Sequence, residues 1–468
     1  MIKIYLYKFI SYDNVYSIVF EYSNFFFMCR FNKIMFYFEL NNEIIFIFSN
    51  VLATKVIITF VYILLNKKMG EYKIMSLPRY ITDINRITQI PEEERAKLSK
   101  ITDKFVFRVN EYYLNLINWD DPEDPIKKLV IPNTHELSEE YGRWDASDED
   151  TNYVVPGCQH KYKTTALLIC SEVCGAYCRY CFRKRLFRND VKEAMSDVEP
   201  GLDYISKTPE INNVLLTGGD PLILAARRLD MIFTRLREMD HVKIIRVGSK
   251  LPVFNPMAIY KNQELLDVIK KHSTPEKRIY IMAHVNHPRE LTEEAYKCFE
   301  ALHNAGAIVV NQTPVLKGIN DDPVVLGELL DKLSWAGVTP YYFFINRPVR
   351  GNDDFVLSLE EAYNIVEGAK ARTSGLGKRV RLSMSHTAGK LEILAIENGK
   401  AYLKFHQSRD GDYGKFIVLD CPKDAAWFDD LPGNKAHWEQ PEKKTDDVVS
   451  VNEMKDMPEP RRPRRRQA

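Results

Sequence analysis

Apolar and polar positions follow two periods along the middle of the chain, between about residues 160 and 346. Short apolar runs alternate with stretches in which apolar residues recur every three or four positions, as in Arg228–Arg237 and Leu291–Ala305. The runs are typical of strands buried on both faces, and the stretches of amphipathic helices. We therefore predict an α/β fold with βαβ units and a parallel sheet. Six units suit a partial (β/α)6 barrel, with strands at Thr165–Cys170, Asn213–Thr217, Val242–Val247, Arg278–His284, Ala307–Gln312 and Thr339–Ile345.

The regions flanking this core, residues 160–346, differ from it in pattern. Residues 69–159 are predicted to form an N-terminal helical region, and residues 347–436 a C-terminal α+β region. In the latter, two apolar runs flank Glu397-Asn398-Gly399, and Asn-Gly is a strong hairpin signal. Residues 437–468 are rich in Pro, Glu, Asp and Lys, a composition that predicts a disordered charged tail.

Residues 1–68 have an unusual composition, with no Gly, no Pro and a single Ala at position 53. Their residues are those of A/T-rich codons, so we interpret the segment as an upstream stretch translated in frame, with the start at Met69 or Met75. The alternative is membrane anchoring through Ile44–Leu65, which is about long enough to span a bilayer. Lys55 at its middle would oppose insertion by roughly 2.5–3.5 kcal/mol.

The overall charge gives no electrostatic argument for a polyanionic partner. Lys and Arg number 65 against 64 Asp and Glu, a formal net charge of +1, so no nucleic-acid partner is expected from the whole chain. The run Arg461–Arg466 could bind an acidic partner, and we interpret it as part of the solvated tail.

Four cysteines fall within the twelve residues Cys170–Cys181, and the last three, Cys174, Cys178 and Cys181, have the spacing C-x3-C-x2-C. Three thiolates can hold three irons of a [4Fe–4S] cluster and leave the fourth iron open to a substrate, whereas electron carriers cap every iron. Cys170 ends a predicted buried strand and is expected not to be a ligand.

Zinc and disulfides fit the cysteine pattern less well. A structural zinc takes four ligands, usually as two pairs, and the sequence has one such pair at Cys178 and Cys181. No zinc is therefore predicted. Scattered cysteines without a secretory cleavage pattern argue against disulfides. An open-iron cluster requires a reducing interior, so a cytoplasmic location is expected.

A second signal follows the second predicted strand, at Gly218-Gly219-Asp220. Two glycines at a strand end let the backbone approach a ligand closely and adopt positive φ. A tight βα turn would have the same residues, so the signal gains weight from the cysteines that follow the neighbouring strand.

Together these residues resemble the radical SAM superfamily, whose clusters bind and cleave S-adenosylmethionine (SAM), and within it the lysine 2,3-aminomutase family. The resemblance covers about residues 80–435. It is carried by His160-Lys-Tyr162, Cys178-Arg-Tyr-Cys181-Phe-Arg183, Gly218-Gly-Asp220, His284-Val-Asn-His287-Pro288, Asn311-Gln312, Leu316-Lys-Gly318-Ile-Asn-Asp321, Pro340-Tyr-Tyr342, Thr373-Ser-Gly375 and Ala388-Gly389-Lys390.

The resemblance implies a radical SAM barrel and a 2,3-aminomutase that moves an amino group from C2 to C3 of an amino acid, lysine by default. It implies a [4Fe–4S] cluster on the three cysteines, SAM, and pyridoxal phosphate (PLP) held by Lys390 as a Schiff base, so that residues 347–436 become a PLP-binding region. For SAM, it places Arg183 at the carboxylate, Tyr180 at the adenine and the backbone of the Gly-Gly-Asp loop at the amino group.

Two departures from the family pattern concern PLP and substrate. The pattern His-Arg-Tyr-x-x-Arg for the PLP phosphate reads His160-Lys161-Tyr162-Lys163-Thr164-Thr165 here, so Lys161 and Tyr162 remain and the second arginine is absent. Of the two aspartates that grip a lysine substrate's distal ammonium, Asp321 matches one, and Ser383 stands at the other. The family's C-terminal zinc cysteines are also missing, so any homo-oligomer should pack differently.

Alternatives therefore stay open. The same chemistry could act on glutamate, arginine or a protein-bound lysine, or the chain could be a PLP-independent radical SAM enzyme. A non-enzymatic iron–sulfur module bound to nucleic acid through the arginine tail is a further reading. For an enzyme, the expected partners are a small amino-acid substrate and a reducing donor such as flavodoxin or ferredoxin.

Overall fold

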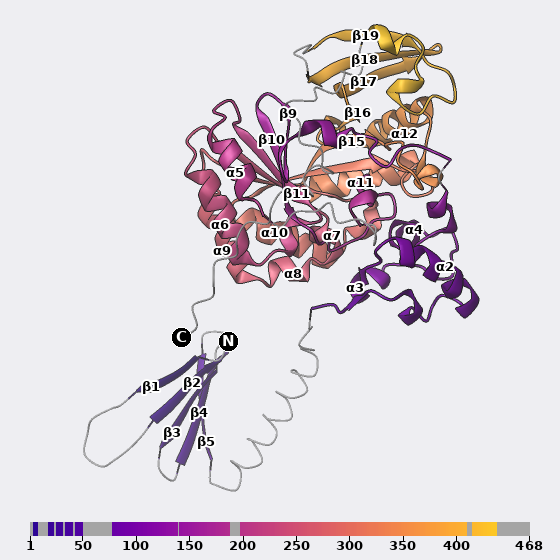
Figure 1. Cartoon of the computed structure of the whole chain (residues 1–468). Coiled ribbons are helices and arrows are strands. Elements are labelled where there is room, and N and C mark those ends of the chain that lie inside the picture. Colours follow the sequence, from indigo (N-terminus) through magenta and orange to yellow (C-terminus); the bar gives the residue numbers. More distant parts are fainter. Residues whose placement is uncertain are drawn as a thin grey trace, which may run out of the picture. The chain divides into compact units, whose positions relative to one another are not determined.

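The structure is a computed structural model. It describes residues 77–437, except 139, 188–196 and 410–413, and five strands among the first 76 residues. The chain divides into two compact units, Met1–Ser76 and Leu77–Ala468 (Figure 1). The predicted tail from residue 438 onward lies outside the described residues.

The first unit contains an antiparallel sheet in which each strand pairs with the next along the chain. Residues 44–49 of the considered membrane segment belong to its last strand, and residues 50–65 lie outside the described residues. Within the described part of the chain, no helix combines the length and apolar character that a membrane crossing requires. The strands are β1 (Lys3–Tyr7), β2 (Ser17–Tyr22), β3 (Phe25–Arg30), β4 (Lys33–Leu40) and β5 (Glu43–Ser49).

The second unit is built on one sheet with the order β19-β18-β17-β16-β15-β14-β13-β12-β11-β10-β9-β8. Neighbouring strands from β10 to β16 are parallel, and both ends of the sheet are antiparallel. The strands are β8 (Tyr153–Val155), β9 (Cys158–Tyr162), β10 (Thr165–Ser171), β11 (Asn213–Gly218), β12 (Ile244–Ser249), β13 (Ile279–Ala283), β14 (Ile308–Val315), β15 (Thr339–Ile345), β16 (Arg381–His386), β17 (Gly389–Glu397), β18 (Lys400–Ser408) and β19 (Phe416–Asp420).

Helices connect the parallel strands, as βαβ units require. Local sequence sets their starts: Thr292, Asp322 and Ser358 accept hydrogen bonds from the first turns of α10, α11 and α12. The apolar faces of these helices pack on the sheet in the main core. Their bounds are α5 (Glu199–Ser206), α6 (Ala226–Arg237), α7 (Leu251–Phe254), α8 (Met257–Tyr260), α9 (Gln263–His272), α10 (Glu293–Asn304), α11 (Pro323–Trp335) and α12 (Leu359–Arg372).

The N-terminal region has a core of its own, which extends to the segment that carries the cysteines. Ala176 and Tyr180 belong to this second core. Glu136 forms a buried ion pair with Lys184 at 3.2 Å and another with Arg179, so the C-terminal part of the cysteine segment is anchored to this region. The elements of this region are α2 (Glu92–Lys104), α3 (Glu111–Leu114), α4 (Pro125–Val130) and the short pair β6 (Tyr80–Ile81) and β7 (Val109–Asn110).

The large, mostly parallel α/β sheet was predicted, and all six expected strands are present. Two features differ from the prediction. The sheet begins with β8 at Tyr153, before the expected start of the core at residue 160, and β16 continues the parallel order as a seventh strand. The expected hairpin forms β17 and β18, with Asn398 and Gly399 at φ 53° and 68° in its turn.

Candidate active site

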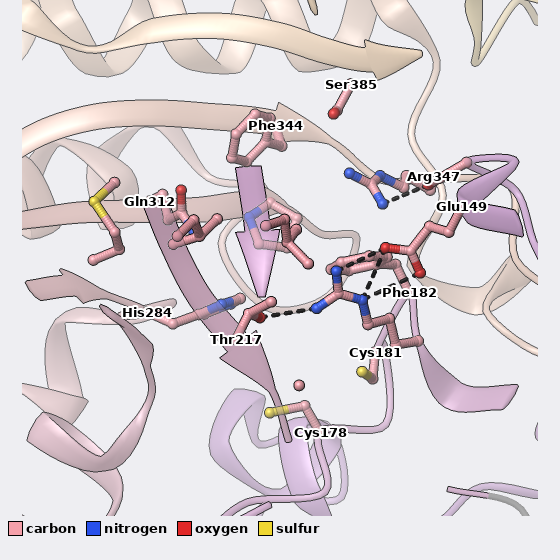
Figure 2. Close-up of a pocket in the computed structure, with 18 of the residues that line it drawn as sticks. Glu149, Cys178, Cys181, Phe182, Thr217, His284, Gln312, Phe344, Arg347 and Ser385 are labelled. Carbon is pink, nitrogen blue, oxygen red and sulfur yellow. Dashed lines mark hydrogen bonds and ion pairs between the residues drawn. The ribbon is translucent and has the colours of Figure 1, made fainter. Parts of the chain in front are cut away.

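A cavity of about 350 Å³ is lined by side chains from every strand between β9 and β18 and by the cysteine loop, residues 172–183. Because strands so far apart in the sheet line one cavity, the sheet curves around it. Figure 2 shows Cys178 and Cys181 at one end of this space, with Phe344 and Ser385 at the other. Residues from the cysteine loop and from the C-terminal strands thus share one chamber.

The three spaced cysteines lie together. Cys174, Cys178 and Cys181 line the cavity as free thiols. Burial raises the pKa of each thiol, and the neighbouring cysteine thiols raise it further at Cys174 and Cys178. Bound metal reverses this effect, because a coordinating thiol is deprotonated. Three cavity-facing thiols suit a cluster with three protein ligands.

Cys170 is placed differently. Its sulfur contacts the carbonyl oxygen of Thr217 at 3.5 Å, and the side chain belongs to the main core. Burial raises the pKa of its thiol to about 12. The structure therefore separates Cys170 from the three cysteines of the cavity.

The Gly218-Gly219 turn lies directly against the cysteine loop. Gly218 has φ +132°, and the N–H of Gly219 donates to the carbonyl of Ser171 at 2.8 Å. A Cβ on Gly219 would lie 2.2 Å from the carbonyl oxygen of Val173 and 2.8 Å from the nitrogen of Cys174. The glycines are thus required for close approach of two backbones, and this fixes the loop that carries the cysteines.

Gly219→Ala should therefore distort the cysteine loop and reduce the iron content after reconstitution. We expect the free energy of unfolding to fall by about 1–3 kcal/mol, as for overpacking at a rigid site. Iron analysis and thermal unfolding measure both effects. Gly375→Ala is the matched control, because a Cβ there meets nothing within 4 Å; equal iron in the two variants would contradict the role of the turn.

Asp220 uses its carboxylate within the protein. Its oxygens accept hydrogen bonds from the Ser249 hydroxyl at 2.9 Å and from three backbone N–H groups, those of Leu222, Lys250 and Leu251. Burial raises its pKa, and these bonds lower it. The side chain joins the end of β11 to the start of α7, while the residue lines the cavity.

Arg183 lines the cavity and is held by two elements. Its Nε and Nη2 donate to Glu149 at 2.9 and 2.7 Å, and its Nη1 donates to Thr217 at 2.8 Å (Figure 2). These bonds engage three of the five N–H groups of a guanidinium. Arg183 and Arg185 hold the pKa of Glu149 far below its usual range, despite burial.

Tyr180 also lines the cavity and is fixed by a polar network. Its hydroxyl donates to Asn286 at 2.6 Å and lies 3.0 Å from Nε2 of His284. Lys250 donates to the same Asn286 oxygen at 2.7 Å and pairs with Glu290 at 2.6 Å. Burial and the charge of Lys250 lower the pKa of His284 to about 3, so this imidazole is neutral.

Lys390 lies near the start of β17 and lines the same cavity. Its Nζ lies 4.2 Å from the ring centre of Tyr342 and has no hydrogen bond or ion pair with any described residue. Desolvation and the charges of Arg246, Lys161 and Arg347 lower its pKa to about 7. Gly389 permits this position, since a Cβ there would lie 2.2 Å from the carbonyl oxygen of Gln407.

Lys161 and Tyr162, at the end of β9, line the cavity as well. Lys161 donates to the carbonyl of His386, just before the turn that leads to Lys390. Desolvation and the charges of Arg347 and Arg409 lower its pKa to about 7. Lys390, which has no described hydrogen-bond or ion-pair partner, and the nearby basic groups of Lys161 and Arg347 together suit an aldehyde that carries a phosphate.

The two residues expected to grip the substrate are not among the described residues that line the cavity. Asp321 accepts a hydrogen bond from the N–H of Gly318 at 2.8 Å, in the turn after β14. Ser383 is fully buried in β16, and its hydroxyl has no described partner. Ser385, two residues further along the strand, does line the cavity.

Sequence reasoning missed two cations of the cavity, Arg246 on β12 and Arg347 after β15. Arg246 donates to Asn213 at 2.8 Å, and burial lowers its pKa. Neither has a motif around it. For Arg246, the available signal was an arginine inside the predicted apolar strand Val242–Val247, where burial of a charge is costly unless the group is paired and hydrogen-bonded.

The sequence is similar to a superfamily model and to several named proteins. Residues 168–329 match the model of the radical SAM superfamily. The chain is 50% identical over 354 residues to a protein of Aquifex aeolicus named "Putative L-lysine 2,3-aminomutase", covering 75% of this chain and 94% of that protein. It is 34% identical to the L-lysine 2,3-aminomutase of Clostridium subterminale, over 63% of this chain and 70% of the relative. It is also 34% identical to the glutamate 2,3-aminomutase of Clostridioides difficile, over 66% and 72%.

Proposed function

Because the chain belongs to the lysine 2,3-aminomutase family of radical SAM enzymes, we propose that it moves the amino group of a free amino acid from C2 to C3, with L-lysine as the first substrate to test. The observation that supports this most strongly is the shared cavity. Three free thiols and an unpartnered lysine of lowered pKa line one chamber of about 350 Å³. The reaction needs both chemistries within reach of one small molecule.

In this proposal Cys174, Cys178 and Cys181 hold the cluster, the Gly-Gly-Asp loop, Tyr180 and Arg183 contact SAM, and Lys390 binds PLP with Lys161 and Tyr162 nearby. When bound, the cluster with SAM supplies a carbon radical, and PLP supplies a conjugated ring that carries the migrating nitrogen. An electron must enter from outside, and we propose a flavodoxin or ferredoxin as its source. The open iron site requires a reducing compartment, so a cytoplasmic location is part of the proposal.

The surroundings of Lys390 support two roles, attack on a carbonyl carbon and transfer of a proton. An amine with a pKa of about 7 is largely neutral at physiological pH, so its lone pair can attack a carbonyl carbon, whereas an ordinary lysine is protonated. After the substrate amine has displaced it, the same nitrogen can hold a proton and return. The ring centres of Tyr342 and Phe344 lie 4.2 and 5.5 Å from its Nζ, so apolar groups contribute to the desolvation that lowers its pKa.

Glutamate is the second substrate to test, because of the charges that line the cavity. Asp321 and Ser383 do not line it, and the lining carboxylates Glu149 and Asp220 are engaged within the protein. Lining cations such as Arg246 favour an anionic distal group over an ammonium. The enzyme is incubated with each amino acid, and the products are separated by chiral chromatography and identified by mass spectrometry. Formation of β-lysine or of β-glutamate then shows which amino acid is the substrate.

The experiment that tests the proposal is borohydride trapping of anaerobically reconstituted enzyme with PLP. We expect a phosphopyridoxyl group on Lys390, identified by peptide mass spectrometry. Its rate of formation should rise as the pH increases through about 7 and level off above, because the lowered pKa makes the amine neutral there. A rate that keeps rising toward pH 10, as for an ordinary lysine, would contradict the lowered pKa. If protein with an intact cluster formed no phosphopyridoxyl adduct, a PLP-independent reaction would be favoured.

A further inference from the structure

The phosphate-binding motif of this chain is incomplete. Lys161 stands at its first cationic position, and Thr165 at its second, where the family pattern has arginine. Thr165 begins β10 and lines the cavity, so an arginine at this position would also lie at the cavity wall. A phosphate monoester carries a charge of about −1.5 to −2 at pH 7, which one lysine does not balance.

Arg347 is positioned to supply the second charge. It follows β15, lines the cavity, and its guanidinium stacks 3.9 Å from the ring centre of Phe182. Its Nη1 donates to the Ser147 hydroxyl at 2.5 Å. Figure 2 shows it beside Glu149, on the wall of the chamber that Ser385 also lines. Two neutral contacts therefore fix its orientation, and they leave further N–H groups for a ligand.

The charges around Arg347 are unbalanced. No described carboxylate oxygen lies within 4.0 Å of its guanidinium, in contrast to Arg183 and Lys250, which have ion pairs with Glu149 and Glu290. Glu149 is near but also binds Arg183 and Arg185, at 2.7 and 2.9 Å. Among the charged groups that lower the pKa of Lys161, Arg347 has the largest effect. A dianion bound between these two groups would favour the charged form of Lys161, as a nearby opposite charge does for any lysine, and would offset the repulsion between them.

We propose that Arg347 is the second phosphate-binding cation of the PLP site and replaces, from the end of β15, the arginine missing at position 165. This rests on the proposed function, since it assumes that PLP binds beside Lys390. A guanidinium can form a two-point contact with phosphate oxygens, so Arg347 and Lys161 together would fix the phosphate arm of PLP, which is attached to the ring carbon beside the one that bears the reactive aldehyde.

Binding of PLP and of pyridoxal, which lacks the phosphate, separates this role from others. Both aldehydes are titrated into full-length, cluster-loaded protein and followed by absorbance. Arg347→Gln should lower the ratio of PLP affinity to pyridoxal affinity by about 10- to 100-fold, as expected for loss of a charge-assisted contact to phosphate. The ratio is the readout because loss of the Arg347 charge also raises the pKa of Lys390, which affects both aldehydes alike. Arg347→Lys keeps the positive charge but cannot form the two-point contact, so its PLP affinity should fall less than that of Arg347→Gln. It also provides a second variant if the glutamine variant does not fold.

Arg409→Gln is the matched control. Arg409 also lowers the pKa of Lys161, but it is absent from the described cavity wall and donates to Thr151 at 3.2 Å. The PLP-to-pyridoxal affinity ratio should stay unchanged in this variant. An equal fall for Arg409→Gln, or an unchanged ratio for Arg347→Gln, would overturn the proposal. If the wild-type protein bound neither aldehyde at Lys390, the proposed function itself would fail, independently of Arg347.

Discussion

Replacement of Lys390 by alanine is expected to stop amino-group migration while SAM cleavage continues. The reason is that Lys390 is the amine of the cavity without a described partner, whereas Lys161 and Lys250 donate to His386 and Glu290. Turnover should fall by a factor on the order of 10³ or more, since a covalent contact and a proton-carrying group are lost together. Formation of 5′-deoxyadenosine and of β-amino acid is measured in the same reaction.

The control for this variant is Lys404→Ala, on the neighbouring strand β18, where the side chain is exposed. It should behave as the wild-type protein in both assays. Continued migration by Lys390→Ala would show that another group holds PLP. A trapped adduct on Lys161 in that variant would identify the group, because Lys161 also has a pKa of about 7.

Alanine at Cys174, Cys178 or Cys181 is expected to abolish both SAM cleavage and migration. Each of these thiols lines the cavity, and removal of one leaves an iron without its protein ligand. Iron and sulfide content after anaerobic reconstitution should fall to the level of protein denatured before treatment. Electron paramagnetic resonance of the dithionite-reduced protein should lose the cluster signal.

Cys170→Ala distinguishes ligation from general damage. Its thiol lies in the core against the Thr217 carbonyl, so this variant should lose some stability and keep its iron. Loss of iron in Cys170→Ala, or full iron in any of the other three, would overturn the choice of ligands. The same measurements therefore test both the three-ligand cluster and the exclusion of the fourth cysteine.

The strands could be predicted where burial on both faces produced continuous apolar runs. β16, Arg381-Leu-Ser-Met-Ser-His386, was missed because polar and apolar residues alternate in it. Such alternation does not reveal that its inward side chains face a cavity instead of solvent. The neighbouring hairpin was found because Asn398-Gly399 is a local signal that needs no knowledge of the rest of the chain.

The sequence alone determined the features that depend on neighbours in the chain. These are the cysteine spacing, the two glycines after β11, the strand that takes Cys170 into the core, and the ordered motifs that single out Lys390. Tertiary structure decided what lies across the cavity. It brought Lys390, Arg246 and Arg347 together from β17, β12 and the segment after β15, and it placed Asp321 and Ser383 away from the described wall. The physical reason is that spacing along a chain fixes local geometry, whereas charge, desolvation and pKa depend on groups that meet only when the sheet curves.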